Sequence, residues 1–94
     1  MTAHVYVVIA SEAYEYSNAF VAFTNKESAD AFANKCKSHE SARPRAPDDA
    51  MEDSPEGNAL YAKWVKVFKR WERQHPAKEN ICSYYDVQEL ELRP

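Results

Sequence analysis

Hydrophobic and polar positions divide this chain into five segments. Residues 5–10 are β-branched or aromatic with almost no interruption, and residues 18–24 alternate large and small apolar side chains. Both patterns are typical of strands, so we predict a hairpin across residues 11–17. Residues 81–92 alternate as a last strand, and their apolar phase changes near Gln88, which predicts a bulge there or a shift in which face is buried. The most apolar strand, 5–10, is expected in the middle of the sheet.

The first segment with helical periodicity follows the predicted hairpin. Thr24 and Glu27 have the spacing of a capping box, in which the Thr24 side chain accepts from the Glu27 amide and Glu27 reaches back. This predicts a helix that starts at Thr24 and fades near His39. Its narrow apolar stripe, expected to lie on the sheet, comprises Ala29, Phe32, Ala33 and Cys36.

The longest amphipathic segment spans residues 54–76. Ser54 is a favourable N-cap, Pro55 suits the first turn, and Pro76 ends the segment. At 100° per residue, one sector holds Leu60, Trp64, Val67, Phe68 and Trp71, and the opposite sector holds Lys63, Lys66, Lys69, Arg70 and Arg73. We predict that both tryptophans pack in the core against the sheet; the alternative is stacking on a ligand.

The element order predicts an α+β fold, with a three-stranded sheet of chain order ββααβ and two helices packed on one face. The 94 residues form a single domain, 1–94. Within it, residues 40–54 contain two prolines and no hydrophobic period, so we predict an acidic loop. The sequence leaves open whether this loop is ordered alone and in which direction the last strand runs.

Charge is unevenly distributed along the chain. The net charge is −3, yet six acids between residues 40 and 56 precede six bases between residues 63 and 78. One interpretation is that the two regions are solvated and partly neutralise each other. The other is a polarised surface that steers a charged partner. Its candidate contact residues are Lys63, Lys66, Lys69, Arg70, Arg73, Asp48, Asp49, Glu52, Asp53 and, in the hairpin loop, Tyr14 and Tyr16, unless these tyrosines only cover the sheet edge.

Sequence signals of catalysis are weak. The single glycine excludes phosphate loops of the P-loop or dinucleotide type, and no serine has the glycine-flanked context of a nucleophile. Cys36 and His39 do not complete a zinc ligand set, and Cys36 and Cys82 are expected to be reduced core thiols. Glu89 and Glu91 suit a solvated strand edge. We therefore predict a protein that is not an enzyme, with no cofactor, no metal and no membrane partner, in the cytoplasm.

Three segments together resemble a known plan. They are Val-Tyr-Val-Val at 5–8, Phe-Thr-Asn-Lys-Glu-Ser-Ala-Asp-Ala-Phe-Ala at 23–33 and Tyr-Asp-Val-Gln-Glu-Leu-Glu-Leu at 85–92. This arrangement resembles small accessory proteins of tailed phages and prophages, which combine a hairpin, a helix opening Phe-Thr/Ser-x-x-Glu-x-Ala and a strand of the Tyr-x-Val-x-Glu type. Some such proteins inhibit host defence complexes. The present chain departs from that plan by the insertion of residues 40–79, where a specific function would sit.

The resemblance implies a non-catalytic protein-binding module of anti-CRISPR type. Such a protein would inhibit a host defence complex, protein or ribonucleoprotein, in the cytoplasm of the bacterial host through charged surface contacts. The alternative is a nucleic-acid-binding accessory protein that uses the basic helix face. We expect a monomer or a weak homodimer, in which an edge strand at 18–24 or 81–92 would pair.

Overall fold

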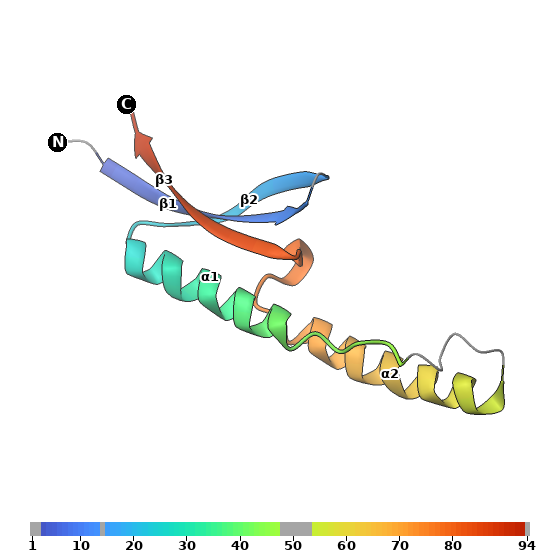
Figure 1. Ribbon diagram of the computed structural model, residues 1–94. Helices are drawn as coiled ribbons and strands as arrows, with labels where there is room; N and C mark the ends of the chain where they lie inside the picture. The colour runs from blue at the N-terminus through green and yellow to red at the C-terminus, as the bar shows by residue number, and fades with distance from the viewer. Residues whose placement is uncertain (1–2, 14, 48–53, 94) are drawn as a thin grey trace.

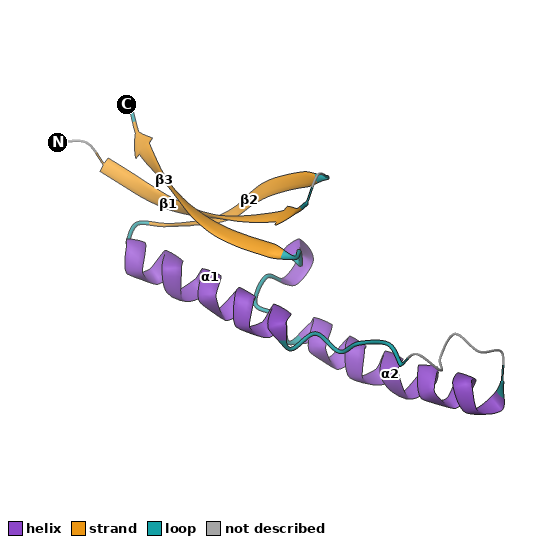
Figure 2. Ribbon diagram, in the orientation of Figure 1, coloured by secondary structure: helices purple, strands orange, loops and turns teal. Residues whose placement is uncertain are grey.

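The protein is a three-stranded antiparallel sheet with two helices, seen in a computed structural model that describes residues 3–13, 15–47 and 54–93. The strands are β1 (Ala3–Glu12), β2 (Tyr16–Phe23) and β3 (Tyr84–Leu92), and they lie in the order β2-β1-β3. The α+β class, the chain order ββααβ and the central place of β1 are confirmed (Figures 1 and 2). The direction that the sequence left open is antiparallel for β3 against β1.

The bulge lies in the hairpin rather than in β3. Val8 pairs with Val21 while its neighbour Ile9 pairs with Ala19, so Phe20 is the extra residue of β2. The ring of Phe20 joins the core, 5.9 Å from Phe32 and 6.4 Å from Tyr85 between centroids. β3 pairs with β1 without interruption from Tyr84 to Leu92. Of the two explanations predicted for the phase change near Gln88, the bulge is therefore wrong. The apolar residues change faces instead, since Leu90 and Leu92 lie on the sheet face opposite Tyr85.

Helix α1 (Lys26–Ser41) covers one face of the sheet. Its N-cap is Asn25, whose extended backbone lets the side chain accept from the Ser28 amide at 3.1 Å. The capping box predicted at Thr24 is wrong by one residue, and the helix continues two residues beyond His39. The stripe that meets the sheet is made of small buried side chains, which let the helix approach closely: Ala29, Ala33 and Cys36.

Helix α2 (Pro55–Arg73) leaves the sheet instead of packing on it. Its predicted start is confirmed, because the Ser54 hydroxyl accepts from the Gly57 amide at 3.0 Å. From the C-terminal end of α1 the helix projects away from the sheet (Figure 1). The molecule measures 65 × 24 × 16 Å, and its radius of gyration of 17.7 Å exceeds the roughly 12 Å of a compact chain of this length. Only α1 lies on the sheet face, so the placement of α2 differs from the expectation.

The chain returns to the sheet through a short turn. After α2, the 3-10 helix η2 (Lys78–Asn80) leads to Cys82, whose amide donates to the Tyr85 hydroxyl at 2.8 Å. β3 starts at Tyr84, three residues later than the pattern predicted. Within the part of the chain that the structure describes, no helix has both the length and the apolar character needed to cross a membrane.

Candidate functional site

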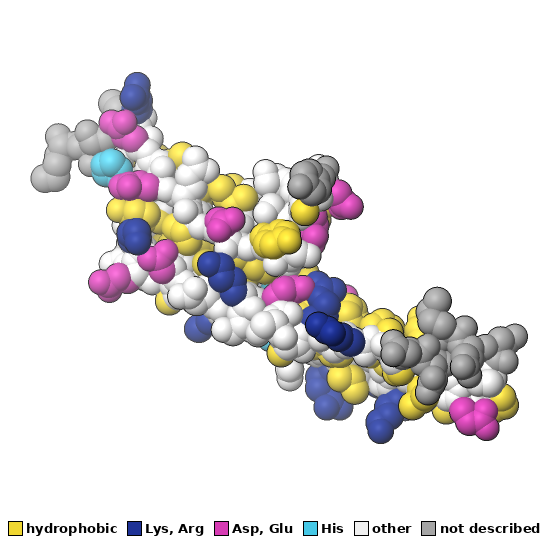
Figure 3. Space-filling model, viewed as in Figure 1, with side chains coloured by type: hydrophobic (Ala, Val, Ile, Leu, Met, Phe, Trp, Pro, Cys, Tyr) yellow, Lys and Arg dark blue, Asp and Glu magenta, His cyan; other side chains and the backbone are white. Residues whose placement is uncertain are grey.

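The basic face of α2 is fully on the surface. All five predicted cations are exposed, and Figure 3 shows Lys and Arg side chains gathered along this helix. Among the described residues, no carboxylate lies within ion-pair distance of any of them. This basic face comprises Lys63, Lys66, Lys69, Arg70 and Arg73. It can therefore attract a negatively charged surface, and the effect weakens with salt.

The apolar side of α2 carries a row of neighbouring aromatic rings, tilted by 40 to 41° to one another. Tyr61, Trp64, Phe68 and Trp71 follow one another at spacings of three and four residues, with centroids 5.2 to 5.6 Å apart. The segment after α1 covers part of this row, because the Arg43 guanidinium lies 4.6 Å from the Trp71 ring centroid. The Trp64 indole N–H also donates to the carbonyl of residue 44 at 3.2 Å. The irregular segment that follows α1 therefore covers part of the apolar side of α2, where the sheet was expected to do so.

The cover leaves one apolar edge of α2 open to solvent. Leu60 is 38% exposed, Val67 is 45% exposed and Tyr61 is 51% exposed. Leu60, Trp64 and Val67 follow the i, i+4, i+7 spacing with which a helix inserts side chains into a groove. We call Leu60, Tyr61 and Val67 the exposed edge of α2. It lies beside the basic face on the same helix.

A reciprocal pair of hydrogen bonds joins the ends of the two helices. The Trp71 indole N–H donates to the His39 carbonyl at 2.7 Å, and the His39 ring nitrogen Nε2 lies 2.6 Å from the Trp71 carbonyl oxygen. The two rings stack at 5.2 Å with an interplanar angle of 17°. Because carbonyl groups only accept, His39 Nε2 must carry a proton in this arrangement. Trp71 therefore holds α2 to α1. Its burial agrees with the prediction, but its indole bonds to and stacks on His39 of α1, where a contact with the sheet was predicted. We call His39, Trp71 and His75 the hinge.

The deepest polar group of the hinge is His75, which is 1% exposed. Its Nδ1 accepts from the Ala77 amide at 3.0 Å, which assigns the proton to Nε2. Nε2 faces the Glu40 carboxylate at 3.3 Å and the Tyr85 hydroxyl at 3.4 Å. Burial lowers the pKa of His75, and the hydrogen bond to Glu40 partly opposes that effect. Burial also raises the pKa of Tyr85 to about 12, so both groups are neutral at pH 7.

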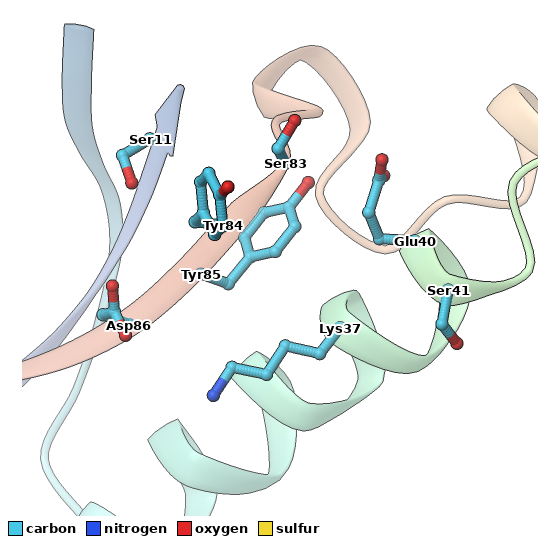
Figure 4. Close-up of a pocket in the computed structure, with 8 residues that line it drawn as sticks. All are labelled: Ser11, Lys37, Glu40, Ser41, Ser83, Tyr84, Tyr85 and Asp86. Atoms are coloured by element: carbon cyan, nitrogen blue, oxygen red, sulfur yellow. The ribbon is translucent and has the colours of Figure 1, made fainter. Parts of the chain in front are cut away.

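A groove with polar side chains along it opens beside the hinge, between α1 and the start of β3. Its volume is about 430 Å³, and Figure 4 shows the Tyr85 ring lying between the strand and the helix. The Lys37 amine points away from Glu40, whose carboxylate is bound by Arg43 at 2.6 Å. The lining supplies hydroxyls and carboxylates without an activated nucleophile: Ser11, Lys37, Glu40, Ser41, Ser83, Tyr84, Tyr85 and Asp86. The groove can bind polar groups. Its side chains are not arranged for any particular catalytic reaction.

The predicted contact residues do not form one surface in the described structure. The five cations lie together on α2, whereas Tyr16 lies at the start of β2, where its hydroxyl accepts from the Cys82 thiol at 3.5 Å. The other predicted residues lie outside the described part of the chain: Tyr14, Asp48, Asp49, Glu52 and Asp53. The exposed edge and the His75 hinge were missed. The signal for the hinge was present, because His75 continues the spacing of Phe68 and Trp71 by one turn.

The sulfur and acidic groups occupy structural positions. Cys36 and Cys82 are free and buried, as expected, and burial raises the pKa of the Cys36 thiol to about 11. Glu89 binds His4 at 3.1 Å, and Glu91 lies near Arg93 at the exposed end of β3. Residues 3–13, 15–47 and 54–93 contain no cluster of three or more metal-ligating side chains.

Comparison of the chain with protein-family models, with curated proteins and with solved structures found no significant match.

Proposed function

We propose that the protein is a non-catalytic binding module that uses the projecting helix α2 to engage a protein partner. The observation that supports this proposal is the exposed edge, Leu60, Tyr61 and Val67, on a helix that lies away from the sheet. Exposed apolar side chains in a row favour association, because covering them removes that area from water. The lack of an activated nucleophile in the described groove agrees with a binding role.

The chemistry of α2 defines the partner. An apolar groove would take Leu60, Trp64 and Val67, and an acidic rim would face Lys63, Lys66 and Arg70 on the adjacent side of the helix. The apolar contacts would supply most of the affinity, and the cations would set orientation and speed of association. The resemblance to phage accessory proteins makes a host defence complex in the bacterial cytoplasm the expected target.

Nucleic-acid binding is the second candidate, because five cations lie on one helix of 19 residues. Two observations disfavour it: the net charge is −3, and one of the two indoles on this helix, Trp71, is buried in the hinge and cannot stack on a base. Salt distinguishes the candidates. Affinity for DNA or RNA would fall steeply with salt, whereas an interface with an apolar centre would lose only part of its strength.

The test is a pull-down with tagged protein from nuclease-treated bacterial lysate, followed by Kd measurements with the purified partner. The variant Lys66→Glu/Arg70→Glu should bind about tenfold more weakly or worse, equivalent to about 1.4 kcal/mol. Leu60→Asp/Val67→Asp should bind still more weakly. The matched control is Lys35→Glu/Lys37→Glu, which reverses two exposed charges on α1 and should bind like the wild type. A partner that binds all four proteins equally would refute the assignment to α2.

A further inference from the structure

The segment that covers α2 has the sequence pattern of a polyproline II helix. Residues 43–47 read Arg-Pro-Arg-Ala-Pro and belong to no helix or strand. Pro44 and Pro47 are half-buried, whereas Arg45 and Ala46 between them are exposed. Burial of every third residue is the periodicity of polyproline II, which has three residues per turn. The two prolines therefore lie on one side of the segment, and their partial burial indicates that this side faces α2, along which the segment runs (Figure 1).

The contacts of this segment are those with which aromatic surfaces bind proline-rich peptides. The Trp64 indole N–H donates to the Pro44 carbonyl at 3.2 Å. That oxygen is free to accept, because polyproline II has no internal hydrogen bonds. The Arg43 guanidinium lies 5.9 Å from the Phe68 ring centroid and 4.6 Å from that of Trp71. We call residues 43–47 the docked segment and name as the aromatic row Tyr61, Trp64, Phe68 and Trp71.

The docked segment matches the aromatic row in length. At about 3.1 Å per residue, residues 43 to 47 span about 12 Å. Along α2, which rises about 1.5 Å per residue, Trp64 lies about 10 Å from Trp71, and Tyr61 lies about 15 Å from it. The segment begins at Trp71 and runs toward the start of α2 (Figure 1), so it ends between Trp64 and Tyr61. Tyr61 is 51% exposed, and its ring therefore keeps free surface for a longer ligand.

The docked segment is held by few bonds and can be exchanged. Among the described residues, its backbone makes one hydrogen bond to Glu40 at the end of α1 and one to Trp64. A peptide from another molecule can make the same contacts with the aromatic row, and its prolines limit the conformational entropy that it loses on binding. Release of the segment leaves α2 attached, because the two hydrogen bonds between Trp71 and His39 do not involve residues 43–47.

We propose that the aromatic row is a binding site for proline-rich segments of partner proteins, and that the docked segment occupies it as an intramolecular competitor. The ligand is an extended peptide of the form Arg-Pro-x-x-Pro, whose arginine covers Phe68 and Trp71 and whose backbone accepts from the Trp64 indole. The docked segment lowers the affinity for such a peptide in proportion to the time it spends docked. The proposal does not rest on the partner of the exposed edge, because its ligand is a peptide and its test uses no other protein.

The probe is the hexapeptide Ala-Arg-Pro-Arg-Ala-Pro with blocked ends, which is residues 42–47 of this chain. Its Kd for the full-length protein is measured by NMR titration of the backbone amide signals. Pro44→Ala/Pro47→Ala removes the fixed φ angles and the rings of the docked segment. This variant should bind the peptide at least about tenfold more tightly than the wild type, as expected for a segment that is docked more than about nine-tenths of the time. The matched control is Arg45→Ala, which changes an exposed side chain and should bind like the wild type.

Two further comparisons test the chemistry of recognition. The peptide Ala-Arg-Ala-Arg-Ala-Ala has the same charge without proline and should bind the double variant at least about tenfold more weakly. Adding Trp64→Phe to the double variant keeps a ring and removes the indole donor, and it should also weaken binding of the proline peptide. Circular dichroism and thermal melting verify that each variant is folded.

Three results would contradict the proposal. If the folded double variant does not bind the proline peptide at millimolar concentration, the aromatic row is not such a site. Equal affinity of the double variant and the wild type would overturn the competition by the docked segment. Equal binding of the two peptides would show that charge alone is recognised, and the Arg-Pro-x-x-Pro ligand class would then be wrong.

Discussion

The two helices differ in how they bury their apolar sides: α1 packs on the sheet, and α2 projects away from it. α1 has a weakly amphipathic sequence, yet its small buried residues, Ala29, Ala33 and Cys36, pack directly on the sheet. α2 has the more strongly amphipathic sequence and the larger rings, yet only Gly57 and Trp71 are buried along it. The difference shows that a clear apolar stripe predicts a need for cover, whereas close packing depends on whether a second surface is within reach.

The largest expected effect separates the hinge from the outer part of α2. Trp71→Ala should lower the free energy of unfolding by about 3 to 5 kcal/mol, because its ring is almost fully buried and its indole N–H bonds to His39. Trp64→Ala should cost about 1 to 2 kcal/mol, since that ring is only half-buried, and the exposed Leu60→Ala should cost less again. Urea denaturation measures all three.

The order of the three losses is the informative result. A loss at Trp64 as large as that at Trp71 would show that the outer half of α2 belongs to the cooperative core. The comparison between the two regions would then fail, because both would unfold as one unit.

The second expected effect is a loss of stability in acid that originates in the hinge. Because burial lowers the pKa of His75, the unfolded chain takes up a proton at a higher pH than the folded chain. The contribution of His75 to the free energy of unfolding is therefore fully present above the unperturbed histidine pKa of 6.5. As the pH decreases below 6.5, the free energy of unfolding decreases by up to about 1.4 kcal/mol per pH unit. The groups that face His75 and modulate this loss are His39, Glu40, Arg43 and Tyr85.

Substitution of single histidines isolates this contribution. His75→Gln should flatten the pH dependence of the unfolding free energy below 6.5, measured by urea titration at several pH values. His4→Gln gives the comparison with an exposed histidine, which lies at the other end of β1 from the hinge and pairs with Glu89. An unchanged slope in His75→Gln would assign the acid sensitivity to other groups.

The smallest expected effect compares the caps of the two helices. Asn25→Ala should cost about 1 kcal/mol of global stability, whereas Thr24→Ala should cost only a few tenths, because Asn25 accepts from the Ser28 amide. Ser54→Ala removes an equivalent bond in α2, yet it should mainly speed hydrogen exchange in the first turn of that helix and leave the melting temperature nearly unchanged. Equal shifts in melting temperature for Asn25→Ala and Ser54→Ala would show that the first turn of α2 does not open independently of the rest of the fold.

Sequence patterns predicted the local elements better than their packing. The order of the strands and the Ser54 cap were predictable because they depend on composition and on nearby residues. The bulge at Phe20 was not, since it exists only relative to the register of β1. The one-residue error between Thr24 and Asn25 arose because both are good caps, and the choice between them depends on backbone angles.

The candidate site could likewise be predicted only where it depends on local sequence. Exposure of the five cations followed from helical phase, and it is observed. The same phase predicted the burial of Trp71 but not its neighbour, since the ring packs on His39 of α1, and it overestimated the burial of Trp64. Periodicity identifies an apolar face without identifying what covers it. His75 was missed, although it continues the spacing of Phe68 and Trp71, because its polar partners Glu40 and Tyr85 are distant in sequence.

The positions of the tryptophans give the protein a built-in optical label. Both indoles of the chain, Trp64 and Trp71, lie on α2, and the sheet and α1 contain none. Intrinsic tryptophan emission therefore reports on one region only. Docking of a partner along Leu60 and Val67 should alter it through Trp64, and opening of the hinge should alter it through Trp71, whose ring stacks on His39. Fluorescence therefore reports binding at α2 without any added dye.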